Sequence, residues 1–536
     1  MNDYFLTYPY PSKRVCSIAK KGMVATSQPL AAQAGMEILK MGGNAVDAAI
    51  ATAACLTVVE PSSNGIGGDA FALVWMNNSL YGLNASGTAP METTVDYVKS
   101  QGYSSMPERG FIPVTVPGAP SAWAALSKRF GKLSLKEVLQ PAINYAREGF
   151  PLSPTGGRNW RNGVNKLKEL LKGEEHEAFF DTFAPNGKTP QIGEIWKSEN
   201  FATTLESIAE TNAESFYRGE LADKIDAFSR KYGGKIRKED LANFYPEWVT
   251  PISAHYKGYD IWEIPPNGQG IVVLMALNML KAYKFHEKEQ IDTYHTQLEA
   301  MKLAFTDGKA FVTEAEDMKV KVEELLSEEY ANERRKLIKE TATPPEAGKP
   351  QHSGTVYMAT ADEDGNMVSF IQSNYRDFGS GLVVPGTGIL LQNRGHNFSL
   401  DSEHVNCLKP GKRTYHTIIP GFITKGDTAI GPFGVIGAFM QPQGQVQVVM
   451  NMIEFGLNPQ AAIDAPRWQW FGDNRIMLET NVPRHIIEGL GRKGHEISMS
   501  VDSNEFGRAQ IIWRDPDTGV YYGGTESRTD GSVAVW

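Results

Sequence analysis

The chain has 536 residues, of which 41% are hydrophobic, and this is ample for a well-buried core. Length alone favours two to four domains, although one large sandwich-type domain is compatible with it. The net charge of -9 and the pI near 5.7 argue against an electrostatic nucleic-acid binder.

The N-terminal part of the sequence predicts neither a secretory signal nor a membrane span. The start, MNDYFLTYPYPSKRVCSIAKKG, lacks a basic region followed by an apolar core. The longest mostly apolar run, residues 45–61, is too short for a span and carries Asp47, so we expect a buried helix. Cys16, Cys55 and Cys407 are odd in number and widely spaced, which favours a reducing compartment. These features predict a soluble, cytoplasmic globular protein without a membrane partner.

Helices dominate the first two-thirds of the sequence. Residues 31–61 predict two helices, because Gly42-Gly43 stops the first and Asn44 is a suitable N-cap for the second. Another helix opens at Ser134, where Glu137 has the spacing of a capping box. Further helices are expected at 222–233, 292–311 and 327–341.

The composition of the chain changes just before residue 355. The charge-dense stretch 314–340 is most simply a solvated helical face, and a polar, proline-broken linker follows at 341–354. Beyond it, TVYMATA and MVSFIQS predict two strands around the turn DEDGN. Strands and glycine turns then alternate, interrupted by one helix with Asn458 as its N-cap and Pro459 at its first position.

Several common site types lack their sequence patterns here. The histidines form no His-Glu-x-x-His, and no cysteine pair has ligand spacing, so no metal is expected. Gly65, Gly67 and Ala70 loosely fit a dinucleotide loop, but turn-forming residues precede them where a strand is required. The segment NASGT lacks the first glycine of a serine-hydrolase elbow. The glycine-rich loops are better explained by a close approach of the backbone to a substrate or another strand.

Gly354-Thr355 has two interpretations. Threonine is common in strands, and this one opens a strand. Alternatively, the chain cuts itself before Thr355, which frees an α-amine with an ordinary pKa near 8. A threonine hydroxyl is a weak nucleophile without an adjacent base, and an N-terminal threonine carries its own base. The flexible linker before it suits an intramolecular attack on the preceding carbonyl.

Several blocks of the sequence resemble the gamma-glutamyltranspeptidase family, in order and over nearly the whole chain. They are MGGNAVDAAIATAACLTVVEPSSNGIGGDAF, VPGAPSAWAAL, FGSGLVVPGTGILLQN, FGLNPQAAIDAPRW and GGTESRTDGSVAVW. The resemblance implies an α+β fold of the N-terminal-nucleophile hydrolase type, a four-layer αββα sandwich with two antiparallel sheets between helical layers. It also implies self-cleavage into a helix-rich large portion, 1–354, and a small portion, 355–536, which together form one globular unit. No cofactor is implied.

The resemblance also assigns catalytic roles. Cleavage between Gly354 and Thr355 makes Thr355 the nucleophile, and Ser373 falls where the family has a hydroxyl that bonds the nucleophile's amine. The backbone oxyanion hole falls at Gly437 and Ala438. The family usually has two glycines there, and a backbone donor tolerates Ala438 if its φ is negative.

The substrate-binding positions depart from the family. An arginine that grips the substrate's α-carboxylate is replaced by Ser86, and an aspartate that holds the α-amine is replaced by Asn397. The asparagine beside that aspartate becomes Tyr375, and a paired serine becomes His416-Thr417. Losing both charges weakens the binding of an amino-acid head group, since charge-assisted pairs are the strong ones.

Arg394 stands where the family usually has glutamine or glutamate. Arg394 and His416 are candidates to receive a carboxylate that has no adjacent amine, as in a glutaryl-type acyl group. A purely structural role is open for both, Arg394 pairing within the fold and His416 as a satisfied core histidine.

The sequence therefore predicts a self-processing amidohydrolase or acyltransferase with a threonine nucleophile. It would cleave a gamma-glutamyl-like amide through an acyl-enzyme and pass the acyl group to water or an amine. One alternative is a glutaryl or cephalosporin-type acylase, and another is a catalytically silent binding protein that keeps the fold uncut. The expected partner is a small-molecule amide and not nucleic acid, and further dimerisation of the processed pair is left open.

Overall fold

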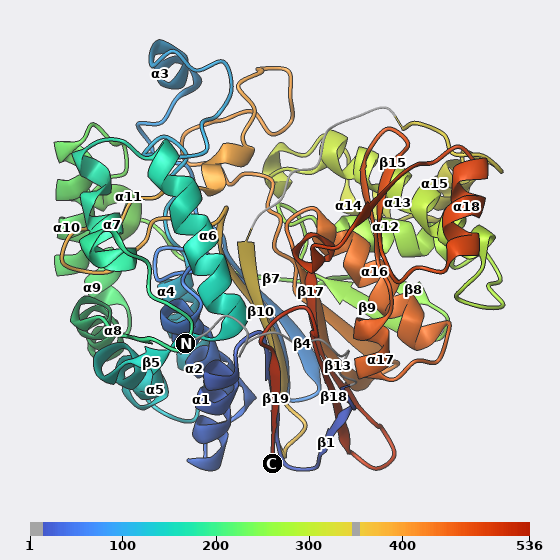
Figure 1. Cartoon of the computed structure of the whole chain (residues 1–536), viewed down its shortest axis with the longest axis horizontal. Coiled ribbons are helices and arrows are strands. Elements are labelled where there is room, and N and C mark those ends of the chain that lie inside the picture. Colours follow the sequence, from blue (N-terminus) through green and yellow to red (C-terminus); the bar gives the residue numbers. More distant parts are fainter. Residues whose placement is uncertain (1–13, 346–353) are drawn as a thin grey trace.

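Two seven-stranded antiparallel sheets form the centre of the computed structural model, which describes residues 14–345 and 354–536 (Figure 1). The β13 sheet has the order β1-β18-β17-β13-β12-β9-β8, and the β10 sheet has the order β19-β2-β10-β11-β3-β4-β7. The strands of the β13 sheet are β1 (Ser17–Ala19), β8 (Ile252–Tyr256), β9 (Tyr259–Glu263), β12 (Gly421–Lys425), β13 (Thr428–Ile436), β17 (Arg508–Arg514) and β18 (Tyr521–Thr525). Those of the β10 sheet are β2 (Met23–Thr26), β3 (Asp69–Met76), β4 (Ser79–Ala85), β7 (Glu247–Val249), β10 (Gly354–Ala361), β11 (Met367–Tyr375) and β19 (Ser532–Val535).

Helices cover the outer face of each sheet (Figure 1). Over the β10 sheet lie α1 (Pro29–Lys40), α2 (Ala45–Val59), α4 (Ala119–Phe130), α5 (Leu135–Glu148), α6 (Pro154–Leu170), α7 (Glu177–Phe183), α8 (Glu199–Thr211), α9 (Glu214–Tyr217), α10 (Glu220–Lys231) and α11 (Lys238–Ala242). Over the β13 sheet lie α12 (Gly270–Leu280), α13 (Ile291–Phe311), α14 (Val322–Leu325), α15 (Glu328–Arg335), α16 (Met440–Ile453), α17 (Pro459–Asp464) and α18 (Arg484–Arg492). The outlying elements are α3 (Val95–Ser100), the pair β5 (Phe150–Pro151) and β6 (Ile195–Trp196), and the sheet β14 (Trp468–Gly472), β15 (Arg475–Glu479) and β16 (Glu496–Ser500).

Strand alternation divides the core into three layers. In β10, Val356 and Met358 face the helices α1 to α11, while Tyr357 and Ala359 face the other sheet. The layer between the sheets also contains Phe422 and other residues of the β13 sheet. Because alternate residues of a strand point to opposite faces, each central strand contributes to two of these layers. The arrangement confirms the predicted four-layer αββα sandwich.

In the helix-rich part of the chain, local sequence signals such as N-caps predicted the positions of most helices correctly. Asn44 caps α2 by accepting from the amides of Val46 and Asp47, and the Asp47 carboxylate closes the capping box. The capping box of Ser134 and Glu137 opens α5 as predicted. Within the described ranges, no helix has the length and apolar character needed to cross a bilayer.

Two predictions about regular structure were wrong. The charge-dense stretch 314–340 is not one helical face but short helices separated by turns, α14 and α15 among them. The part after residue 355 has three α-helices and not one, because α16 and α18 accompany α17. Most of the linker lies outside the described residues, at 346–353.

We expect Asp47→Ala to lower the free energy of unfolding by about 2–4 kcal/mol, because it leaves several buried donors unpaired. The buried Asp47 Oδ2 accepts from the amides of Asn44 (3.0 Å), Lys132 (2.9 Å) and Leu133 (3.3 Å). Urea denaturation followed by tryptophan fluorescence measures the effect. Asp47→Asn keeps an acceptor oxygen and serves as the control with a smaller loss. Equal losses in both variants would mean that these hydrogen bonds contribute little.

Candidate active site around Thr355

Thr355 and Ser373 meet on the central hairpin of the β10 sheet. Both side chains are fully buried, and their hydroxyl oxygens lie 3.1 Å apart. The register shifts here, since Gly354 pairs with Tyr375 while Val356 pairs with Gln372. This β-bulge gives β11 one extra residue and brings Ser373 beside Thr355. On the other side, the pairing of β10 with β2 runs only from Met358 to Ala361, so that strand does not reach Thr355.

A glycine loop packs its backbone directly behind this pair. A Cβ atom at Gly68 would lie 2.6 Å from the Ser373 carbonyl oxygen, and one at Gly67 would lie 2.3 Å from that of Leu390. Neither position has room for a side chain. The expectation that these glycines permit a close approach of two backbones is confirmed.

Gly437 and Ala438 link the end of β13 to the start of α16. In the ranges that the structure describes, neither amide N–H has a protein acceptor, so both are available to an incoming oxygen. The Ala438 carbonyl accepts from Gln269 Nε2 at 2.8 Å, which fixes the orientation of this turn. The condition of a negative φ at Ala438 is not met, because φ is 52° there and 119° at Gly437. Alanine is thus held in the left-handed region that favours glycine, at a cost of about 1 kcal/mol.

Arg394 brings a buried positive charge to the site. Its Nη1 donates to Thr417 Oγ1 at 2.6 Å, and its guanidinium lies over the Tyr375 ring, 4.3 Å from the centroid. Its Nε and Nη2 have no hydrogen-bond partner within the described part of the chain. Burial lowers the pKa of Arg394 to about 10, with the nearby Asp69 opposing the shift. The side chain is therefore charged at neutral pH and has unused donors.

Asp69 and His416 form a second buried pair. Asp69 is the partner of Ser373 in the pairing of β3 with β11, and it accepts from His416 Nε2 at 2.9 Å, Gln392 Nε2 at 2.7 Å and the Gly87 amide at 3.0 Å. Burial raises the pKa of Asp69 to about 7, although Arg394 opposes this shift. Burial also lowers the pKa of His416 well below its ordinary value. The contact is therefore a hydrogen bond from a neutral imidazole and not an ion pair.

Tyr375 and Asn397 are held by each other. The Tyr375 hydroxyl donates to Asn397 Oδ1 at 2.5 Å, and Asn397 Nδ2 donates to the Tyr415 carbonyl at 3.0 Å. The Tyr375 amide donates to Ser373 Oγ at 2.8 Å, and its backbone has a positive φ of 76°. These contacts hold Tyr375 and Asn397 beside Ser373.

Comparison with known proteins identifies the family of the chain. The family model described as Gamma-glutamyltranspeptidase matches residues 31–536. The chain belongs to the gamma-glutamyltranspeptidase family. A curated relative is the glutathione hydrolase-like YwrD proenzyme of Bacillus subtilis (strain 168), 39% identical over 96% of this chain and 98% of its own. The oxamate amidohydrolase proenzyme of Klebsiella pneumoniae is 32% identical over 97% of this chain and 99% of its own length. The crystal structure of cephalosporin acylase from Bacillus halodurans superposes with a TM-score of 0.97 at 62% identity and covers 99% of this chain and 98% of that one.

The positions that the resemblance assigns to the substrate head group make contacts within this fold. Ser86 Oγ donates to Asn84 Oδ1 at 2.7 Å and lies 3.4 Å from Asn267 Oδ1, so its hydroxyl is engaged. Asn397 uses both ends of its carboxamide on Tyr375 and Tyr415. Residues found by resemblance thus surround one region, but Asp69 was missed. Its signal was a single acidic residue directly after a glycine loop, at the head of the apolar strand DAFALVWM.

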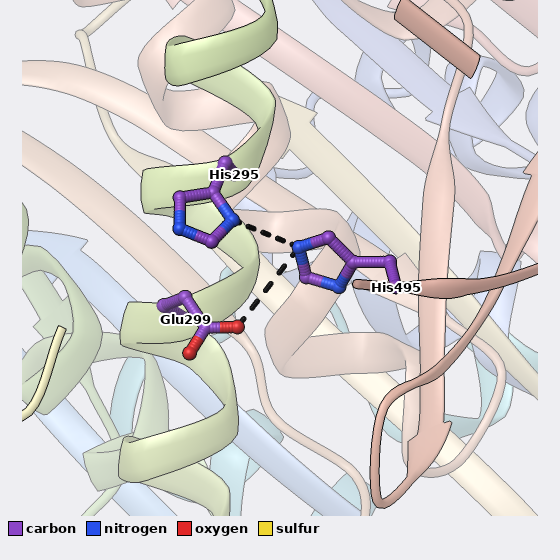
Figure 2. Close-up of side chains that lie close together, drawn as sticks. All are labelled: His295, Glu299 and His495. Carbon is purple, nitrogen blue, oxygen red and sulfur yellow. Dashed lines mark hydrogen bonds and ion pairs between the residues drawn. The ribbon is translucent and has the colours of Figure 1, made fainter. Parts of the chain in front are cut away.

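Figure 2 shows a separate cluster of metal-ligating residue types, His295, Glu299 and His495, with ligand atoms within 4.8 Å of one another. His295 Nε2 donates to the Lys339 carbonyl at 2.8 Å, so its Nδ1 accepts from His495 Nε2 at 2.9 Å. Burial lowers the pKa of His495 to about 3, which keeps that ring neutral.

The charges of this cluster are already balanced. Lys302 Nζ lies 2.5 Å from Glu299 Oε1, and both side chains are buried. A divalent cation there would face an ammonium group at contact distance, so we interpret the cluster as a polar network. It connects α13 with Lys339 and with the start of β16. Sequence spacing missed it because His295 and His495 are 200 residues apart.

Ionisation of Asp69 should make the enzyme less stable as pH rises. An aspartate ordinarily has a pKa near 3.9, and its folded-state value here is about 7. The folded protein therefore binds more protons than the unfolded chain between about pH 4 and 7, and stability falls across that window. Between pH 4 and pH 7, the free energy of unfolding of Asp69→Asn should rise relative to that of wild type by up to about 4 kcal/mol. If urea denaturation gave the same pH dependence of stability for Asp69→Asn and wild type, that result would contradict the raised pKa of Asp69.

Proposed function

We propose that the protein is a self-processing amidohydrolase in which Thr355 is the nucleophile. The observation that carries the proposal is the contact of Thr355 Oγ1 with Ser373 Oγ, at the head of a central strand and behind a polar linker. In processing, Thr355 Oγ1 attacks the Gly354 carbonyl carbon, and the Gly354–Thr355 amide becomes an ester with a free amine. Water then hydrolyses the ester, which leaves the Gly354 carboxylate and the Thr355 hydroxyl.

The mature site then repeats this chemistry on a substrate amide. The Thr355 α-amine takes the hydroxyl proton, Ser373 orients that amine, and Thr355 Oγ1 forms an ester with the acyl group. The amides of Gly437 and Ala438 face the oxyanion that develops on the carbonyl. The amine product leaves with the proton, and water or a second amine takes the acyl group. Names of relatives support this reading, since three of those compared are proenzymes or acylases.

The large and small portions should stay together after the cut. Strand β10 of the small portion lies between β2 of the large portion and β11 of its own hairpin. The β13 sheet likewise contains β8 and β9 of the large portion beside β12 and β13 of the small one. We infer one interlocked heterodimer, and further dimerisation stays a proposal. A cytoplasmic location also stays a proposal, and the three free cysteines support it.

For the acyl group, we favour a carboxylate without an adjacent amine. Arg394 offers two unused donors, whereas Asp69 already accepts from three groups and Asn397 is fully engaged. An α-amine of a gamma-glutamyl group would therefore lack an anionic partner, and a glutaryl-type group would not need one. A relative named cephalosporin acylase and one named oxamate amidohydrolase agree with this class. Gamma-glutamyl amides are the competing class, supported by the relative named glutathione hydrolase-like.

Thr355→Ala should block both maturation and amide hydrolysis, because it removes the attacking hydroxyl. Intact mass under denaturing conditions should show one chain of 59.0 kDa in the variant. Wild type should show about 39 and 20 kDa, in proportion to a cut after residue 354 of 536, the smaller piece beginning Thr-Val-Tyr-Met. Thr355→Ser retains a hydroxyl and should still cut. An uncut, inactive wild type would instead support the silent binding protein.

Arg394→Gln should reduce kcat/KM for a glutaryl anilide about 10- to 100-fold, the effect of losing a charged hydrogen bond. Self-cleavage and hydrolysis of a butyryl anilide should change little, because neither needs the cation. Wild type should prefer the glutaryl over the gamma-glutamyl anilide. Equal losses on glutaryl and butyryl anilides would show that Arg394 is structural, and a wild-type preference for gamma-glutamyl would reverse the substrate assignment.

A further inference from the structure

A pocket of about 600 Å³ borders the turn that carries the proposed oxyanion amides. Its lining includes Ser63, Arg109, Lys166, Arg376, Gly437 and Glu505. Gly437 supplies one of the two backbone amides that have no protein acceptor within the described ranges. The pocket therefore reaches the turn at which we place the carbonyl of the substrate.

The same pocket lies at the end of β11, beside the proposed nucleophile. Arg376 directly follows the residue that pairs with Gly354 in the ladder between β10 and β11. The carbonyl of Ser63 accepts from the amide of Asn374, the neighbour of Ser373. Residues of the pocket lining are thus in contact with the strand end that holds the candidate active site.

The acyl site and this pocket meet at the oxyanion turn but have different lining residues. Arg394 and its partner Thr417 hold the acyl group in the proposed function, and neither is among the described residues that line the pocket. Gln269 Nε2 donates to the Thr417 carbonyl at 2.6 Å and to the Ala438 carbonyl at 2.8 Å, so Thr417 lies near Ala438. Gly437, the other residue of the turn, lines the pocket. A substrate whose carbonyl oxygen meets both amides would extend its acyl half towards Arg394 and its amine half into the pocket.

The wall of the pocket on the side of the β10 sheet is rich in cations. It carries Lys166 of α6, Arg376 after β11, and Arg109, whose Nη2 lies 2.6 Å from Glu108 Oε1. Lys166 has no hydrogen-bond or ion-pair partner in the part of the chain that the structure describes. Burial lowers the pKa of Arg109, the charge of Arg376 adds to the shift, and Glu108 and Asp377 oppose it. The guanidinium groups of Arg109 and Arg376 therefore repel each other, which favours an anion at this wall.

The wall on the side of the β13 sheet has the opposite character. Its charged residues are Asp502, Glu505 and Arg508. Arg508 is engaged, since its Nη1 lies 3.5 Å from Glu60 Oε1. Glu505 Oε2 is buried and has no hydrogen-bond partner among the described residues. This wall packs against the oxyanion turn, because a Cβ atom at Gly437 would lie 3.3 Å from the Gly507 Cα. An amine that leaves the carbonyl therefore departs beside an acidic wall, and a carboxylate farther along the amine would meet the cationic one.

We propose that this pocket binds the amine half of the substrate, and that Arg376 and Lys166 select amines that carry a carboxylate away from the scissile nitrogen. The proposal rests on the proposed function, because it names specificity-determining residues for the same reaction. A carboxylate on the amine forms charge-assisted contacts with these two cations, whereas a neutral amine gains nothing from them. An amine that takes the acyl group would use the same pocket, since it attacks the carbonyl from the position that the leaving amine vacates.

The test compares two anilides that share the acyl group which wild type hydrolyses faster. One has an unsubstituted ring, and the other is the amide of 4-aminobenzoate, which adds a carboxylate to the amine half only. Arg376→Gln should lower the ratio of kcat/KM for the carboxylated anilide to that for the plain anilide about tenfold. Lys166→Gln should lower it about two- to fivefold, because Lys166 is exposed. Arg376→Lys and Lys166→Arg keep the charge and should retain most of the ratio.

Lys168→Gln is the matched control for Lys166. Lys168 lies on the same helix, donates to the Gly187 carbonyl at 2.7 Å and is not among the described residues that line this pocket. Its substitution should leave the ratio unchanged. A defect in folding or in the nucleophile lowers both rates and cancels in the ratio, so a change in the ratio reports on the carboxylate.

Binding of the amine product separates the proposal from the proposed function, because it needs no turnover. Ligand-observed NMR should show that 4-aminobenzoate binds wild type more tightly than aniline does, and Arg376→Gln should abolish the difference. A ratio and a binding preference that both variants leave unchanged would overturn the proposal while anilide hydrolysis stands. If wild type neither cut itself nor hydrolysed either anilide, the proposed function would fail, and the binding preference would still decide whether the pocket holds a carboxylated amine.

Discussion

The position of β10 between β2 and β11 is the constraint on which the rest of the structure depends. The proposed cut before Thr355 requires that β10 keep its place in the sheet afterwards. Here β11 pairs with β10 along its length, and β2 pairs with it from Met358 to Ala361. The first residues are left beyond the β2 ladder, so the proposed cut before Thr355 leaves the pairing of β10 with β2 intact. The bulge in the hairpin then sets Ser373 beside it.

A second constraint is the cost of burying charge near that nucleophile. Removing a guanidinium from water costs several kcal/mol unless it is paired and hydrogen-bonded. Thr417 and the Tyr375 ring give Arg394 only partial compensation, and Asp69 acts on it through space while bonded to His416. Such an arrangement persists only where the surrounding fold holds it in place, and it is commonest at functional sites. An incoming carboxylate would supply the missing partner.

Local signals in the sequence predicted much of this architecture. The caps at Asn44 and Ser134, the hairpin after Thr355 and the glycine loop were all readable, because each depends on neighbouring residues. Helix α16 was not predicted, because polar and apolar residues alternate in GQVQVV with the two-residue period of a strand. Its glutamines are buried and bonded to distant backbone: Gln443 and Gln447 each exchange hydrogen bonds with β14, and this tertiary pairing overrides the local pattern. Asp69 was missed for the same reason, because its partners Gln392 and His416 lie far away in sequence.

The positions that the resemblance assigns to the substrate head group are bonded to other residues of this fold. Ser86, which the resemblance places at the carboxylate-binding position, is bonded to Asn84, and Asn397, which it places at the amine-binding position, is bonded to Tyr375. The positive charge stands instead at Arg394, one contact from Thr417. Because each of these residues has a partner inside the fold, substituting the family's residue at one position would break a buried contact. Any gain in substrate binding would be offset by that loss. The proposed nucleophile Thr355 lies on β10 and the proposed oxyanion amides follow β13, whereas Ser373 shares β11 with Tyr375 and accepts from its amide. Tyr375 therefore links the substrate side of the site, through Asn397, to the proposed chemistry, through Ser373.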